Sequence, residues 1–251
     1  MAMVTSATIR AAGINDVERI LAKYRQAIRE LSRDESANLL WRPYDEFKAA
    51  VENGLFFVVE DEAGEFMAGA GVFDLAESRD KELGMCYVKQ PWRGYGLQTL
   101  LLQIRVCAAT LGQVPADADR GANISYAALI TGVKPSNGPS CANTAGFGFE
   151  PLDTPLPALF AACGSCRTPP SAGSGRRCCC DFFYLSDRKR VEAIERSLLM
   201  GQWSRTRGDH QLIVSPKVRH LTDPDFRGAL QDIMQELRVR MKDPCRATCL
   251  N

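Results

Sequence analysis

The 251-residue sequence has no apolar run that approaches the roughly 20 residues a helix needs to span a bilayer. It also has almost no excess charge, because 31 basic residues offset 30 acidic ones and leave a net charge of +1. The first absence excludes a transmembrane helix. The second disfavours nucleic acid and anionic membrane surfaces as partners. We therefore expect no membrane span and no nucleic acid.

Residues 1–13 lack the charged start and the following apolar run of a secretory signal. We therefore expect a cytoplasmic protein. Histidine is scarce too, with only His210 and His220 in the chain. Surface positions are the expectation for both.

Cysteine is more frequent than usual, with ten residues, but without a secretory signal a disulfide framework is a weak interpretation. Cys163 and Cys166, followed by Cys178 and Cys180, resemble a four-thiolate zinc arrangement. The spacing is shorter than that of a zinc ribbon, and the second pair is Cys-x-Cys. On a strand that pair shares one face while Cys179 points away, as buried small residues also do. We expect no metal, and zinc stays open as the alternative.

Hydrophobic residues (45%) and charged residues (24%) occur at ordinary globular levels, and their periodicity predicts the elements. Helices are expected within residues 16–31, 43–54, 97–112, 134–152, 187–203 and 223–241. Strands are expected over residues 7–13, 55–61, 65–75, 82–90, 124–133 and 178–186. This order predicts an α/β or α+β domain over residues 1–186 and a C-terminal helical extension over residues 187–251.

Residues 88–101, "VKQPWRGYGLQTLL", place two glycines where a predicted strand gives way to a helix. The helix after Gly96 has no acidic residue in its first turn, and its first N–H groups have no intrahelical partner. The glycines leave these donors uncovered, and the helix dipole adds partial positive charge. Such a turn suits a pyrophosphate, with Arg93 as a further contact. A tight turn without a ligand explains the glycines equally well, since a short Gly-x-Gly is a weak motif.

The same stretch resembles motif A of the GCN5-related N-acetyltransferase (GNAT) superfamily, which reads Arg/Gln-x-x-Gly-x-Gly/Ala between a strand and a helix. The residues that fill it are Arg93, Gly94, Tyr95, Gly96, Leu97 and Gln98. Gln98 departs from the small residue of the family. Its longer side chain would narrow the pyrophosphate site or contact the cofactor, or it marks a site that has decayed.

A second stretch resembles a later motif of the same family. Its spacing is kept by Asn137, Ser140, Thr144, Gly148 and Phe149. The family often has a tyrosine, the general acid, where this chain has Thr144. Asn137 is expected to cap the short helix or to contact the pantetheine arm.

The resemblance covers residues 5–186 and implies a central mixed, mostly antiparallel sheet that is splayed between its fourth and fifth strands. It implies acetyl-CoA as co-substrate in that splay, with its pyrophosphate on the glycine turn. The backbone N–H of Tyr87 or Val88 would polarise the acyl carbonyl. The residues expected to bind the cofactor are Tyr87, Val88, Arg93, Gly94, Tyr95, Gly96, Leu97, Gln98 and Asn137.

Acyl transfer to an amine needs a base, stabilisation of the oxyanion, and a proton for the leaving thiolate. The resemblance points to Glu82 as base; a solvated charge at the strand end explains it as well. The acid stays open between Thr144, Ser140, Tyr126 and Cys141, whose thiol has a reference pKa of ~8.5. A packing or capping role is the alternative for each of them.

The expected reaction is acetyl transfer to a primary amine by direct attack. A longer-chain N-acyltransferase and an inactive CoA-binding module are the alternatives. We expect a small-molecule amine or a peptide as the acceptor. A homodimer is a further expectation, because dimers are common among such proteins.

Overall fold

The structure is a computed structural model, and it describes residues 3–31, 42–75, 80–112, 127–152 and 180–242. Its strands form a single sheet in the order β6-β7-β5-β4-β3-β2-β1-β9-β8. The strands are β1 (Met3–Ala11), β2 (Phe56–Asp61), β3 (Phe66–Asp74), β4 (Lys81–Val88), β5 (Leu129–Val133), β6 (Phe149–Pro151), β7 (Asp181–Leu185), β8 (Trp203–Arg207) and β9 (His210–Lys217). Within the described residues only β4–β5 and β1–β9 pair in parallel. The predicted mixed, mostly antiparallel sheet is therefore confirmed.

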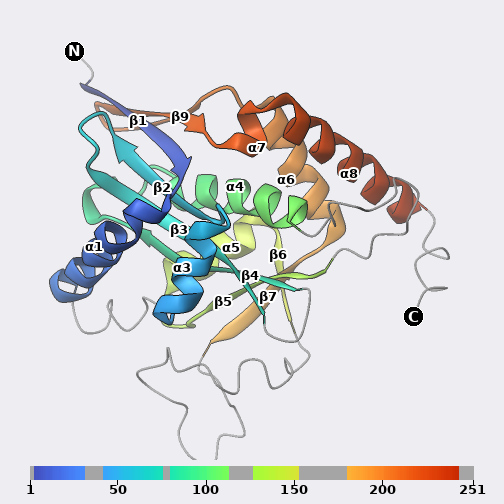
Figure 1. The fold of residues 1–251 in the computed structure, drawn as a ribbon, viewed down its shortest axis with the longest axis horizontal. Coiled ribbons are helices and arrows are strands. Elements are labelled where there is room, and N and C mark those ends of the chain that lie inside the picture. The colour runs from blue at the N-terminus through green and yellow to red at the C-terminus, as the bar shows by residue number, and fades with distance from the viewer. Residues whose placement is uncertain (1–2, 32–41, 76–79, 113–126, 153–179, 243–251) are drawn as a thin grey trace, which may run out of the picture.

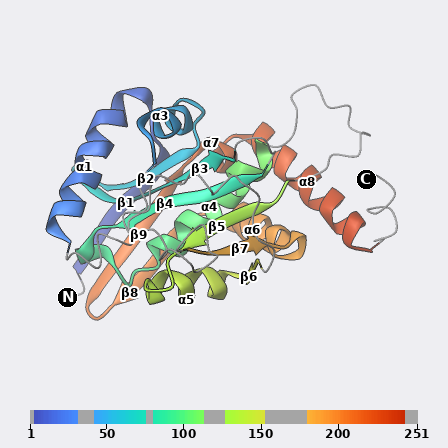
Figure 2. The ribbon, with the colours of Figure 1, turned by 90° about the horizontal axis from the view of Figure 1, so that it is seen from below.

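Helices cover both faces of this sheet, and all of those predicted are present. They are η1 (Ile14–Asp16), α1 (Val17–Glu30), α3 (Tyr44–Glu52), η2 (Gln90–Trp92), α4 (Leu97–Leu111), α5 (Gly138–Phe147), α6 (Asp187–Leu199), α7 (Arg219–Thr222) and α8 (Pro224–Lys242). Figure 1 shows α1 and α3 on one side of the strands and α4 with α6 and α8 on the other. Figure 2 shows α5 and α6 on the side opposite to α1 and α3.

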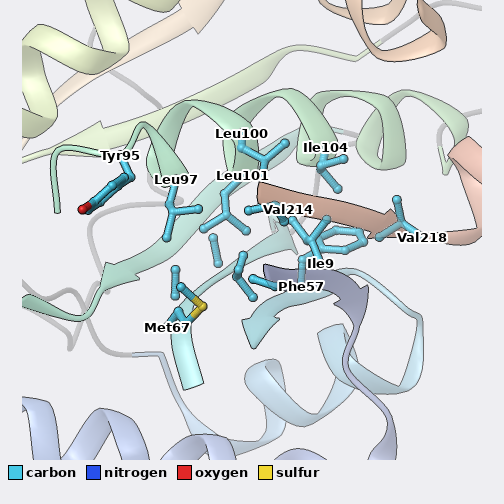
Figure 3. Close-up of a cluster of buried hydrophobic side chains, with 14 of the residues drawn as sticks. Ile9, Phe57, Met67, Tyr95, Leu97, Leu100, Leu101, Ile104, Val214 and Val218 are labelled. Atoms are coloured by element: carbon cyan, nitrogen blue, oxygen red, sulfur yellow. The ribbon is translucent and has the colours of Figure 1, made fainter. Parts of the chain in front are cut away.

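Helix α4 is buried on nearly all sides, as its long apolar sequence requires. One side faces the concave sheet: Figure 3 shows Leu97, Leu101 and Ile104 among side chains of β1, β2, β3 and β9. The opposite side packs on the two C-terminal helices, where Cys107 contacts a cluster with Ile194 and Leu230. The C-terminal helices therefore pack on the domain core rather than over the glycine turn.

The two helices expected in the C-terminal extension are present as α6 and α8, and two strands that the sequence analysis did not predict lie between them. Strands β8 and β9 form an antiparallel hairpin, and β9 pairs in parallel with β1 from Met3↔His210 to Arg10↔Lys217. Gly208 lies at the turn of this hairpin with a φ of 57°. A Gly-Asp pair between two extended segments is a hairpin signal, so residues 208 and 209 were the clue in the sequence. The division of the chain at residue 186 stays a prediction, although the sheet crosses it.

The predicted splay lies between β4 and β5. The two strands pair only at Lys81↔Leu129 and Glu82↔Ile130, although β4 continues to Val88. Beyond this point, Thr131 Oγ1 donates to the Leu83 carbonyl at 2.9 Å. The diverging part of the two strands opens a gap in the hydrogen-bonded ladder, with α4 and α5 beside it.

A bulge in β4 bends the strand at the splay. Its register with β3 shifts near Gly71, and Met85 has a φ of 48°, which is rare for a residue with a side chain. Tyr24 from α1 hydrogen-bonds the Met85 carbonyl at 2.6 Å. On the other face, buried Arg105 of α4 donates to the carbonyls of Gly71 and Gly84 at 3.3 and 3.2 Å. Two buried side chains thus satisfy the carbonyls that the bulge frees.

None of the helices within the described residues is long and apolar enough to cross a bilayer.

Candidate active site

The glycine turn, residues 93–98, joins η2 to α4. Gly94 and Gly96 have φ values of 84° and 75°, in the left-handed region that glycine adopts without strain. No side chain caps α4, and within the described residues no hydrogen bond uses the N–H of Leu97, Gln98 or Thr99. The first turn of α4 also has no acidic residue. The predicted set of unused donors at the positive end of a helix is therefore present.

Strand β8 lies against this turn, which the sequence did not suggest. A Cβ atom on Gly94 would lie 3.4 Å from Arg207, and one on Gly96 would lie 3.0 Å from Trp203. Arg207 Nη1 donates to the Arg93 carbonyl at 2.9 Å. Arg205 stacks on the Trp203 ring at 4.6 Å, and the indole N–H of Trp203 is buried without a described partner. The C-terminal hairpin therefore brings two arginines and an unused donor to the turn.

His210 joins this hairpin to the turn. Its Nδ1 lies 3.0 Å from the Tyr95 hydroxyl and its Nε2 lies 2.8 Å from Thr5 Oγ1. The expectation of a surface position is wrong for His220, which is 7% exposed and packs edge-on against Phe57. Burial lowers the pKa of His220 to about 4. Both histidines thus support the fold around α4 and the added strands.

A cavity of about 50 Å³ lies in the splay, between the bulge of β4, the end of β5, α4 and α5. The residues that line it are Leu83, Gly84, Met85, Cys86, Gln98, Leu102, Arg105, Thr131, Gly132, Val133, Lys134, Asn137, Ser140 and Thr144. Three of the predicted site residues, Gln98, Asn137 and Thr144, are thus brought together. Lys134 and Arg105 are cationic side chains that the sequence interpretation missed.

Gln98, which departs from the family motif, links α4 to α5. Its Nε2 donates to Ser140 Oγ at 3.0 Å, while the neighbouring Thr99 donates to Asn143 at 2.7 Å. Asn137 accepts from the Ser140 N–H at 3.3 Å and caps α5, so the capping role is confirmed. The bonds from Gln98 and Thr99 thus join the first turn of α4 to α5.

Glu82 is not solvated, because it is 3% exposed and its carboxylate contacts the guanidinium of Arg42. Arg42 in turn stacks on Phe73, which belongs to the core cluster of α1 and α3. The adjacent Leu83 packs with residues of α4 instead. Glu82 therefore lies on the face opposite the cavity, and any substrate it serves as base would approach from the α1–α3 side.

The candidates for the acid are placed unequally. Thr144 is 2% exposed and lines the cavity. Cys141 does not line it; its thiol donates to the Lys134 carbonyl at 3.6 Å, and burial raises the pKa of that thiol, which makes it a weaker acid. Tyr126 lies outside the described residues.

Several predicted cofactor residues turn their side chains into the core. Tyr87 stacks on Phe66 with the rings 6.3 Å apart, and Tyr95 and Leu97 belong to the cluster shown in Figure 3. Val88 is half-buried and its carbonyl accepts from Arg93 Nε at 3.3 Å. For Tyr87, Tyr95 and Leu97, only the backbone is available to a ligand.

The described residues contain no group of three or more His, Cys, Asp or Glu side chains placed to hold a metal ion. Of the cysteines in the zinc alternative, Cys163, Cys166 and Cys178 lie outside the described residues, as does Cys179. Cys180 is described and half-buried.

No family model matches the chain, and no curated protein sequence matches it. Solved structures that are similar to it include GNAT acetyltransferases. N-acetylglutamate synthase from Neisseria gonorrhoeae, in complex with coenzyme A and N-acetyl-glutamate, matches with a TM-score of 0.47 and 18% identity over 71% of this chain and 34% of its own. This chain thus spans about a third of that synthase.

Two further neighbours match over nearly their whole length. A GNAT-family acetyltransferase from Staphylococcus aureus Mu50 has a TM-score of 0.45 and 12% identity over 71% of this chain and 98% of its own. Spermidine N-acetyltransferase from Vibrio cholerae, in complex with CoA and spermine, has a TM-score of 0.46 and 13% identity over 74% of this chain and 98% of its own.

Proposed function

We propose that this chain is a GNAT-type N-acetyltransferase that moves an acetyl group from acetyl-CoA to a primary amine by direct attack. The observation that carries the proposal is the glycine turn at the mouth of the splay. Its uncapped helix end offers the N–H groups of Leu97, Gln98 and Thr99 to one anion. Arg93, Arg205 and Arg207 surround the turn with positive charge. A pyrophosphate fits this combination of donors and charge.

The splay then directs the rest of the cofactor. Because β4 and β5 separate after Glu82, an extended pantetheine arm can pair with the free edge of β4 as a strand would. The arm would reach the cavity beside the bulge, where Asn137 and Thr144 line the wall. We propose Glu82 as the base for the acceptor amine, which would enter from the face of α1 and α3. A small-molecule amine or a peptide end fits this approach.

The test is calorimetric titration with acetyl-CoA, followed by a panel of amines in which release of the CoA thiol is measured. Saturable binding of acetyl-CoA and thiol release with at least one amine are the expected results. A protein that binds neither acetyl-CoA nor CoA would contradict the proposal. Longer acyl-CoAs in the same titration separate an acetyltransferase from a longer-chain enzyme.

A non-catalytic CoA-binding module is the second candidate, and two observations favour it. Glu82 already contacts Arg42, so accepting a proton would cost that ion pair. Thr144, a poor proton donor, stands where the family often has tyrosine. Tight CoA binding without thiol release over the whole amine panel is the result that this candidate predicts.

A further inference from the structure

Three alternate side chains of β8 face the glycine turn. A Cβ atom on Gly96 would lie 3.0 Å from Trp203 and 3.7 Å from Arg205. One on Gly94 would lie 3.4 Å from Arg207. Side chains two residues apart on a strand share a face, so Trp203, Arg205 and Arg207 form one row along the turn. The C-terminal hairpin therefore lays two cationic side chains along the backbone that the proposed function assigns to a pyrophosphate.

Contacts with the turn and the sheet fix this row in place. Arg207 Nη1 donates to the Arg93 carbonyl at 2.9 Å, and the Arg205 guanidinium lies over the Trp203 ring at 4.6 Å. Strand β8 pairs with β9, and β9 pairs with β1, so the row is tied to the sheet. A ligand that binds these arginines meets cations that are already positioned, which lowers the entropy cost of binding.

The protein does not balance the positive charge of the row. Within the described part of the chain, neither Arg205 nor Arg207 forms an ion pair. The first turn of α4 holds no acidic residue, and its N-terminus adds the positive end of the helix dipole. Like charges gathered at one place repel one another, and an anion among them removes the repulsion. Charges that only protect an edge strand from aggregation have no reason to face the end of a helix. Both arginines are exposed, so an anionic ligand can reach them.

The turn has two sides, and they suit different parts of the cofactor. Gln98 faces the cavity of the splay, which no residue of the described strand β8 lines, whereas Gly96 faces β8. In coenzyme A, the pyrophosphate joins the pantetheine arm to a nucleoside that carries a 3′-phosphate. With the pyrophosphate on the turn and the arm in the splay, the nucleoside leaves the turn on the side of β8.

We propose that Arg205 and Arg207 bind the 3′-phosphate of coenzyme A, so that the C-terminal hairpin selects the cofactor by its nucleoside end. This inference rests on the proposed function. A phosphate monoester carries roughly two negative charges at neutral pH, which two arginines match. The planar guanidinium presents paired N–H donors that fit phosphate oxygens better than a lysine ammonium does. Strand β8 lies beyond residues 5–186, which carry the family resemblance, so this selectivity belongs to the added strands.

The experiment compares CoA with dephospho-CoA, which lacks only the 3′-phosphate, by calorimetry at low and high salt. The wild type should bind CoA roughly tenfold more tightly at low salt, and less selectively at high salt, because the charges of exposed arginines are screened. Replacing both arginines, Arg205→Gln with Arg207→Gln, should reduce this preference to about twofold or less by weakening the binding of CoA alone. Unchanged binding of dephospho-CoA shows, in the same titration, that the variant keeps its fold and its turn.

Two further variants separate charge from geometry. Arg205→Lys with Arg207→Lys should keep part of the preference, because the charge remains while the paired donors are lost. Arg188→Gln with Arg219→Gln is the matched control, since it removes two exposed arginines of α6 and α7, and Arg219 is also stacked on an aromatic ring, that of Phe226. The control should keep the preference of the wild type.

Three results would overturn the assignment of the 3′-phosphate and leave the proposed function intact. The first is a wild type that binds CoA and dephospho-CoA equally well. The second is an Arg205→Gln and Arg207→Gln variant that loses affinity for both ligands alike, which would place these arginines at the pyrophosphate. The third is a control variant that loses the preference as well, which would assign it to net charge. Should neither ligand bind to the wild type, both the assignment and the proposed function fail.

Discussion

The glycine turn and the cavity beside the β4 bulge offer different groups to a ligand. The turn offers backbone N–H donors at the N-terminus of α4, whereas the cavity offers side chains from several separate elements. The turn follows the family motif except at Gln98. The cavity beside the bulge is lined by Thr144, where the second resembled motif often has tyrosine, and by Lys134. Backbone donors keep their chemistry whatever the neighbouring side chains are. Substitutions near the turn therefore alter its donors less than substitutions at the cavity alter the groups offered there.

The largest expected effect comes from breaking the turn. Gly96→Glu would place a carboxylate at the positive end of α4. The backbone conformation there disfavours side chains, and the new Cβ atom would lie 3.0 Å from Trp203. Losing a few charge-assisted hydrogen bonds should weaken CoA binding by roughly 100-fold or more. Calorimetry with CoA measures this.

Gly64→Glu is the matched control for this change. Gly64 has a similar φ of 77°, but nothing lies within 4 Å of its Cβ position. Its backbone strain is comparable and its distance from the turn leaves CoA binding unaffected. Equal losses in both variants would show that strain, rather than the anion site, explains the effect of Gly96→Glu.

The stability of the packing around α4, the helix next to both the turn and the cavity, should depend on pH. His220 packs against the sheet beneath α4, and its pKa falls from 6.5 to about 4 in the folded state. In the unfolded chain, His220 binds a proton as the pH falls below 6.5. In the folded chain it stays neutral until the pH falls to about 4. Stability is complete above the unfolded pKa and falls as the pH drops, by about 2 kcal/mol at pH 5.

Urea unfolding at pH 7 and pH 5 measures this loss. His220→Gln should remove most of the difference between the two pH values, although it lowers stability at both. His210→Gln, the matched control, should keep the difference. A wild type that is equally stable at both pH values would show that His220 accepts its proton within the fold.

The bulge can be loosened without touching the turn. Tyr24→Phe removes the hydroxyl that bonds the carbonyls of Gly69 and Met85 and leaves them buried, at a cost of about 1–2 kcal/mol in unfolding free energy. CoA binding through the turn should remain. Tyr44→Phe, at an exposed tyrosine of α3, should leave stability unchanged. A Tyr24→Phe variant as stable as the wild type would mean that the bulge does not need this bond.

The smallest expected effect concerns the arginines of β8. Replacing Arg205 and Arg207 together with glutamine should weaken CoA binding by up to about tenfold, and less at high salt, because exposed charges are screened. Titrations at low and high ionic strength measure this. Arg188→Gln on the exposed face of α6 is the control for net charge. A double variant with unchanged affinity and salt dependence would confine the phosphate site to the turn itself.

Local patterns made much of this architecture predictable. The apolar spacing of residues 16–31 and 97–112 suffices for two helices, because helical periodicity needs no distant partner. The glycine turn was equally visible, since left-handed backbone next to a helix start favours glycine. The splay came from family resemblance and not from periodicity.

The positions of Lys134 and Glu82 were not predictable from their surroundings in the chain. Lys134 stands in a polar, turn-forming stretch that suggests solvent, and it is buried because α4 and α5 close over the end of β5. Glu82 lies beside charged residues in sequence but meets Arg42, forty residues earlier, only when α3 packs on the sheet. Whether a side chain is buried depends on which distant elements pack over it, and this cannot be predicted from the neighbouring residues in the sequence.

By itself, the sequence determined the helix and strand periodicities and the uncovered backbone at the glycine turn, because these depend on residues a few positions apart. The tertiary structure alone decided that β9 pairs with β1, that two arginines of β8 reach the turn, and that Lys134 is buried. Each of these features depends on contacts between segments that are far apart in the sequence. Such contacts form only when the whole sheet packs against α4.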